Sequence, residues 1–150
     1  MKFLPLFLTA TLIATSSLSF AKDDDKSEAP VEVRLAAASK VLKDSSSISL
    51  VYVKGLVCPS CAIGVRKNLS KMKGVDKKRF RDGIDMNPET QLVTIALKEG
   101  AKIDNKDLIE RVEDAGYIAV EEYKLHEGHM DAHRYKNDAS VDVVHHESRK

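Results

Sequence analysis

The sequence has few of the residues on which several functional classes of protein depend. Its 150 residues include no tryptophan and only two cysteines, and aromatic residues make up 5%. The scarcity of aromatic residues excludes a large base-stacking surface, and a net charge of +1 gives no attraction for nucleic acid. Two cysteines cannot make a disulfide-rich scaffold or a four-thiolate zinc site. They can make one pair, and Cys58 and Cys61 are spaced as a C-x-x-C.

Residues 1–21 have the three-part layout of a secretory signal peptide. A short basic start precedes an apolar run from Phe3 to Ala14, and small polar residues follow. Ser19-Phe20-Ala21 supplies the small residues that a signal peptidase requires, so we expect cleavage after Ala21. The alternative is an uncleaved membrane anchor, which the Ser/Thr-rich second half of the segment disfavours. We therefore expect a periplasmic protein without stable membrane insertion, in an oxidising compartment.

Cleavage removes one lysine and leaves 23 basic and 23 acidic residues. Residues 22–47 are interpreted as a charged and Ser-rich leader and linker, within which Pro30–Lys43 could be a short helix or a strand. The regular hydrophobic pattern begins at Ile48 and ends at Leu125.

Residues 48–125 predict an α+β fold. Runs of β-branched and apolar residues predict strands at Ile48–Val53, Ile84–Met86, Leu92–Leu97 and Tyr117–Leu125. Apolar residues at helical spacing predict two helices, one carrying Cys61, Val65, Leu69 and Met72, and one capped by Asp104 or Asn105 and carrying Leu108, Val112 and Ala115. The order predicts a ferredoxin-like βαββαβ sandwich, in which two helices cover one face of a four-stranded antiparallel sheet.

All five histidines lie in residues 126–150, where the hydrophobic pattern has ended. We expect this tail to be mostly disordered. If its H-x-x-H-M-x-x-H run formed a helix, His126, His129 and His133, with Met130 between them, would share one face and could bind Cu(II), Ni(II) or Zn(II). The alternative is a disordered tail that binds metal only loosely.

The two cysteines occupy a position suited to soft metal ions. Cys58 follows the first predicted strand, and Cys61 lies at the start of the first helix, so both sulfurs can converge at a helix N-terminus that favours thiolates. Thiolates prefer ions such as Cu(I), whereas zinc would need two further ligands. Two alternatives remain open. A structural disulfide would close too short a loop to stabilise the chain much. Thiol–disulfide exchange is the second, because Cys-Pro-Ser-Cys resembles oxidoreductase active sites.

Two motifs resemble those of the heavy-metal-associated domain family. The segment from Gly55 to Cys61 (GLVCPSC) is similar to the family's G-M-x-C-x-x-C loop, and Glu113–Tyr117 (EDAGY) matches its E-D-A-G-Y. With a signal peptide, the chain resembles periplasmic mercury-binding proteins, and small copper chaperones share the fold. The resemblance implies that Cys58 and Cys61 capture Cu(I) or Hg(II) and pass it by ligand exchange to a membrane metal transporter or another metal-accepting protein. It also implies that Tyr117 lies in the loop shielding the site.

The sequence departs from the family pattern at two places. Leu56 stands where the family usually has Met, and Leu can fill that position with little change in volume. The insertion Asp76–Gly83 lengthens the connection to the second strand, and it could form an extended hairpin or a docking loop. No histidine precedes Leu125, so no Cys–His dyad can form within the domain. We therefore predict a monomeric binding protein that is not an enzyme.

Overall fold

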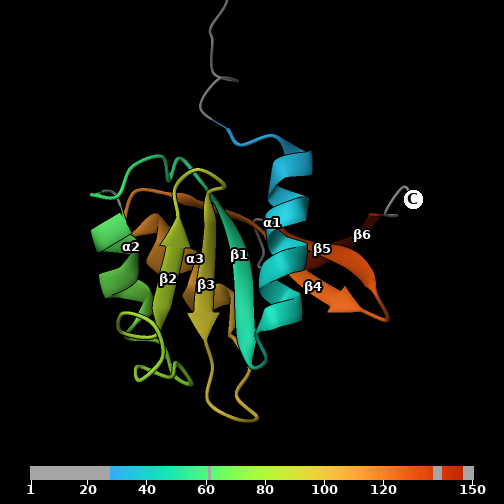
Figure 1. Ribbon diagram of the computed structural model, residues 1–150. Coiled ribbons are helices and arrows are strands. Elements are labelled where there is room, and N and C mark those ends of the chain that lie inside the picture. Colours follow the sequence, from blue (N-terminus) through green and yellow to red (C-terminus); the bar gives the residue numbers. More distant parts are fainter. Residues whose placement is uncertain (1–27, 61, 137–139, 147–150) are drawn as a thin grey trace, which may run out of the picture.

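In the part of the chain that the structure describes, six antiparallel strands form one sheet, and helices pack on both of its faces (Figure 1). The computed structural model describes residues 28–60, 62–136 and 140–146. The predicted signal peptide, residues 22–27 of the leader, and Cys61 lie outside the described residues. In chain order, the elements are α1 (Val31–Asp44), β1 (Ile48–Lys54), α2 (Ala62–Leu69), β2 (Ile84–Asn87), β3 (Leu92–Ala96), α3 (Asn105–Glu113), β4 (Ile118–His126), β5 (His129–Tyr135) and β6 (Val141–His146). The strand order across the sheet is β2-β3-β1-β4-β5-β6.

The predicted βαββαβ order is present from β1 to β4. β1 pairs with both β3 and β4, and β2 pairs with β3. Successive side chains of β1 point to opposite faces, so Val51 packs beneath α2 and α3 while Leu50 packs on the other side. Val65 of α2 and Leu108 of α3 are fully buried in the same core as Val51. The α+β class and the helix-covered face are therefore as predicted.

The start of α3 is held by the cap that its sequence predicts. The Asp104 carboxylate accepts hydrogen bonds from the backbone N–H groups of Lys106 at 2.9 Å and Asp107 at 3.3 Å. These bonds satisfy two of the four N–H groups that a helix N-terminus leaves free. The helix buries Leu108 and Val112, which are one turn apart.

The prediction of a four-stranded sheet is wrong, because β5 and β6 extend it to six strands. Residues 126–150, predicted to be mostly disordered, contain both added strands. β4 and β5 are joined by Glu127 and Gly128, whose φ values of 50° and 86° are typical of a type I′ hairpin turn. The histidines that would share a face on a helix therefore lie in a β-hairpin instead.

A third helix covers the opposite face of the sheet. The segment that could be helix or strand from its sequence forms α1, which contacts β1 and β4. In Figure 1, α1 lies on the near side of the sheet and α3 on the far side. The side chains beneath α1 include Leu50, Tyr52, Tyr123 and Met130. Since Met130 belongs to β5, the added strand contributes to this second core, which a four-stranded domain with helices on one face would lack.

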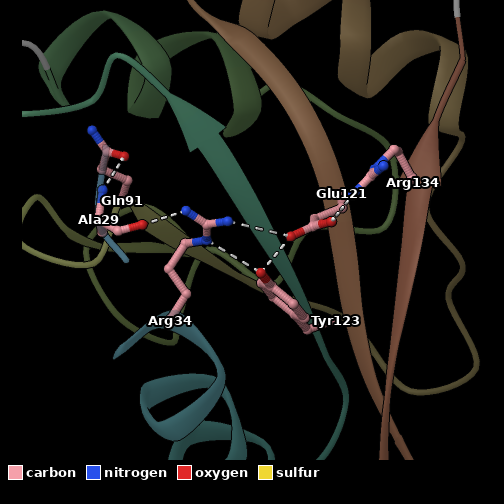
Figure 2. A network of polar contacts seen from close by, with 6 residues as sticks. All are labelled: Ala29, Arg34, Gln91, Glu121, Tyr123 and Arg134. Carbon is pink, nitrogen blue, oxygen red and sulfur yellow. Dashed lines mark hydrogen bonds and ion pairs between the residues drawn. The ribbon is translucent and has the colours of Figure 1, made fainter. Parts of the chain in front are cut away.

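Arg34 anchors α1 to the sheet (Figure 2). Its guanidinium donates hydrogen bonds to the Ala29 carbonyl and, at 3.3 Å, to the Tyr123 hydroxyl. The guanidinium carbon lies 3.9 Å from the centroid of the Tyr52 ring, as in a cation–π contact. One guanidinium nitrogen lies 3.9 Å from a carboxylate oxygen of Glu121. Arg34 therefore joins the start of α1 to both β1 and β4.

Glu121 is the acidic partner in this network. Its carboxylate accepts a hydrogen bond from the Tyr123 hydroxyl, and it pairs with Arg134 of β5 at 3.7 Å. Glu121 and Arg34 are both buried. A buried charge lowers the stability of the fold unless it is paired and hydrogen-bonded. Each of these two groups therefore offsets the cost of burying the other.

The insertion Asp76–Gly83 folds as a compact turn against the end of β3, not as an extended hairpin. The Asp76 N–H donates to the Ala96 carbonyl at 2.9 Å, and the Ala96 N–H donates to the Gly83 carbonyl at 2.8 Å. Both ends of the insertion are thus hydrogen-bonded to the backbone of Ala96, the last residue of β3.

The insertion lies far from the cysteine motif. The Arg79 guanidinium donates to the carbonyls of Ser46 and Ser47 at 3.0 and 3.1 Å, just before β1 begins. The chain then runs the length of β1 before it reaches Cys58. The insertion and Cys58 therefore lie at opposite ends of the sheet.

Gly83→Ala should destabilise the fold more than Gly100→Ala. Both glycines have positive φ, 83° and 71°, so either substitution strains the backbone. A Cβ at Gly83 would also overlap Val75 Cγ1 and lie 2.9 Å from the Asp76 carbonyl oxygen, whereas one at Gly100 would meet nothing within 4 Å. We expect losses of about 2 and about 1 kcal/mol in unfolding free energy, measured by urea denaturation. Equal losses would contradict the close packing of the insertion.

Candidate functional site

Cys58 lies in the short loop that joins β1 to α2. The loop leaves β1 after Lys54, and α2 begins at Ala62. Gly55 has φ of 88°, a conformation that glycine adopts without strain, and it turns the chain away from the strand. At the other end of the loop, the Ile63 N–H donates to the Ser60 carbonyl at 3.3 Å, which forms the first turn leading into the helix. Cys58 is thus placed at the strand-to-helix junction that the sequence predicts.

Leu56 anchors this loop to the core. Its side chain is fully buried and packs in the same cluster as Val65 of α2 and Val112 of α3. It takes the buried position expected for a residue that replaces Met. The following residue, Val57, is exposed, and Cys58 is half-buried. Leu56 therefore holds the loop against the core, while Cys58 stays accessible to solvent.

Cys58 is disulfide-bonded and so carries no titratable thiol. Its sulfur also lies 3.2 Å from the Ser60 hydroxyl oxygen. Cys61, the other cysteine of the sequence, lies outside the described residues, and the convergence of the two sulfurs on a metal stays a prediction. Because only a thiolate is a good ligand, the disulfide has to be reduced before Cys58 can bind a metal ion.

Tyr117 lies beside the cysteine loop, as the resemblance implies. The residue is half-buried and directly precedes β4, and its N–H donates to the Val112 carbonyl at 3.1 Å. A Cβ on Gly55 would lie 3.5 Å from Cδ1 of the Tyr117 ring. The ring therefore lies close to the point where the chain turns toward Cys58.

Three exposed apolar residues were missed by the sequence reasoning. Val57 is in the loop, Ile63 is in the first turn of α2, and Ile118 pairs with Lys54 at the end of β1. All three therefore belong to segments at the Cys58 end of the sheet. Each lies in an apolar stretch of sequence, where a solvent-facing residue looks like a core residue until the buried face is known.

The predicted histidine set is not brought together on a helix. His126 is in β4, whereas His129 and His133 are in β5, and the buried Met130 points to the opposite face of the sheet from His129. Within residues 28–60, 62–136 and 140–146, no three His, Cys, Asp or Glu side chains are arranged to hold a metal ion. In the same ranges, no helix has the length and apolar character needed to cross a membrane.

Residues 50–117 match the family model of the heavy-metal-associated domain. The match begins in β1 and ends at Tyr117, so it includes the Cys58 loop, both helices of the βαββαβ unit and the strands between them. It leaves out α1, β4, β5 and β6. No curated protein and no solved structure gives a significant match to the chain.

Proposed function

We propose that the protein carries soft metal ions in the periplasm, and the match of residues 50–117 to the family model of the heavy-metal-associated domain supports this. Cys58 and Cys61 capture Cu(I) or Hg(II) as cargo. The ion then passes by ligand exchange to a membrane metal transporter or another metal-accepting protein. The protein itself catalyses no reaction. Zinc suits this site less well, because it usually takes four ligands.

The position of Cys58 carries this proposal. The residue is half-buried in a loop directly before α2, where the free N–H groups of a helix N-terminus favour a thiolate over a thiol. The first turn of α2 contains no acidic residue that would oppose this effect, and its basic residues, Arg66 and Lys67, lie in the last turn. The helix N-terminus therefore favours the form in which a reduced cysteine binds a metal ion.

The surroundings of the loop suit transfer between proteins. In ligand exchange, a thiolate of the recipient binds the ion before a cysteine of the donor leaves it, so the ion is not released into water. The recipient must therefore contact the donor closely around Cys58. Exposed apolar side chains favour such contacts, and Val57, Ile63 and Ile118 supply them at this end of the sheet.

An anaerobic titration of the reduced mature protein tests the proposal. With a competing chelator present, Cu(I) and Hg(II) should each bind with one-to-one stoichiometry, and Cys58→Ser and Cys61→Ser should each abolish tight binding. Ser60→Ala is the matched control, because it changes the same loop but keeps both thiols. Wild-type binding no tighter than that of either cysteine variant would overturn the proposal.

Thiol–disulfide exchange is the second candidate, and the disulfide at Cys58 is the observation that favours it. In this case the reduced protein would pass two electrons to a disulfide substrate and become oxidised itself. Reduction of insulin or glutathione disulfide by the wild type, lost in Cys58→Ser and accompanied by no tight metal binding, would favour this function over metal transfer.

A further inference from the structure

A hollow of about 250 Å³ lies where the turn between β4 and β5 meets the end of β6. The residues that line it are all histidine or aspartate, namely His126, His129, Asp131, His145 and His146. Imidazole is a preferred ligand of borderline ions such as Cu(II), Zn(II) and Ni(II), and carboxylate also binds divalent ions. Every side chain around this hollow is therefore a potential metal ligand or a partner for one.

The register of the sheet brings these side chains together from separate segments. His126 is directly opposite His129 across β4 and β5, and Asp131 is directly opposite His145 across β5 and β6. Opposed residues have Cβ atoms roughly 5 Å apart and point to the same face. His129 and Asp131 are two residues apart on β5 and therefore share that face, at a spacing of about 6.6 Å. Three imidazoles thus project from one small area of the sheet.

The contact between Asp131 and His145 already resembles part of a metal site. The Asp131 carboxylate lies 2.7 Å from Nδ1 of His145, within hydrogen-bond distance. This bond fixes the ring and leaves Nε2 as the nitrogen available to an ion. Metal-binding histidines commonly donate their other N–H to a carboxylate in this way, which orients the ring and makes it a better ligand.

We propose that His126, His129 and His145 form a second metal site for a borderline divalent ion, with Asp131 positioning the His145 ring. The side chains are not preassembled, since no described group of three is already arranged around a metal position. All three histidines are exposed, so their rings can rotate toward a common ion without disturbing the core. The ion then closes the site by joining β4, β5 and β6.

This site is separate from the cysteine site. Lys54, near Cys58, pairs with Ile118 at the start of β4, whereas His126 is at the end of that strand. The nine residues of β4 span about 26 Å, so one ion cannot contact both sites. The two sites also differ in the ions they prefer, because soft ions favour thiolates and borderline ions favour imidazoles.

A variant without thiols tests the histidine site independently of the proposed function. Mature protein carrying Cys58→Ser and Cys61→Ser is titrated with Zn(II) against a chromophoric chelator, and with Cu(II) while its electron paramagnetic resonance spectrum is recorded. We expect one equivalent of each ion to bind, with nitrogen hyperfine splitting in the Cu(II) spectrum. Absence of saturable binding of both ions, or a Cu(II) spectrum without nitrogen splitting, would overturn the proposal.

Single substitutions in this background locate the ligands. His129→Ala should weaken binding of Zn(II) more than about 10-fold, and Asp131→Asn should weaken it by about 10-fold while the nitrogen splitting persists. His133→Ala is the matched control, because His133 is on the same strand but does not line the hollow. Equal affinities for His129→Ala and His133→Ala would contradict the assignment. Unchanged thermal unfolding of the metal-free variants would show that the losses come from the site and not from the fold.

Discussion

The oxidised protein should bind neither Cu(I) nor Hg(II) tightly, and reduction should raise its affinity for Cu(I) by more than about 100-fold. Cys58 is disulfide-bonded in the structure, and a disulfide sulfur lacks the negative charge that makes a thiolate a strong ligand. Reduction adds two electrons and two protons to give two thiols, which lose protons as they bind the ion. Loss of a group that only supports a ligand costs about 10–100-fold in metal affinity, so loss of both thiolates should cost more.

Competition titrations of one sample before and after reduction measure this difference. The protein is reduced with a phosphine, which is then removed under anaerobic conditions because excess reductant could itself bind the ion. Cys58→Ser provides the control, since it cannot form the disulfide and should bind weakly after either treatment. A gain in affinity that persists in Cys58→Ser would show that reduction acts elsewhere than at Cys58.

Arg34→Ala should destabilise the protein by about 3–5 kcal/mol, the cost expected when one partner of a buried ion pair is removed. The substitution leaves the buried Glu121 carboxylate without its partner in α1 and removes the cation above the Tyr52 ring. Arg134 still pairs with Glu121 from the exposed side, so we expect a loss near 3 kcal/mol. Because Arg34 joins α1 to the sheet, the helix should separate from it before the rest of the domain unfolds.

Urea denaturation and amide hydrogen exchange measure the two effects. Lys40→Ala is the matched control, because Lys40 is an exposed basic residue on the same helix, and it should change stability by less than about 0.5 kcal/mol. In the double variant Arg34→Ala with Glu121→Gln, neither charge is left buried, so the loss should be smaller than the sum of the losses in Arg34→Ala and Glu121→Gln. Strictly additive losses would mean that the two charges do not depend on each other.

The βαββαβ unit could be predicted because each of its elements has a strong local pattern. The apolar run of β1 and the helical spacing of Val65 and Leu69 lie in segments that are buried by neighbours also rich in apolar residues. The added strands lack such a signal. In β5, Met130 and Ala132 are buried, but His129, Asp131 and His133 alternate with them and give the segment a polar average. A turn of two residues, Glu127-Gly128, was the local signal that could have indicated a hairpin.

The position of Cys58 was predictable for the same reason, since it depends on one strand, one loop and one helix that follow each other in the chain. The pairing of Asp131 with His145 was not predictable. It depends on how β6 aligns with β5, and that register is set by packing and by the loop between the strands. The sequence showed that histidines are numerous in this region, but it could not show which of them face the same side.

The two added strands also change which strand forms the edge of the sheet. In a four-stranded βαββαβ sheet, β4 would be an edge strand, with a row of N–H and C=O groups free to pair with another chain. Here β5 pairs with Glu121–His126 of β4, and along this stretch the edge is moved to β6, which carries Asp142. Charged side chains on an edge strand discourage pairing between sheets. The extension therefore leaves this part of β4 closed to pairing with another chain, while the apolar side chains around Cys58 stay exposed at the other end of the strand.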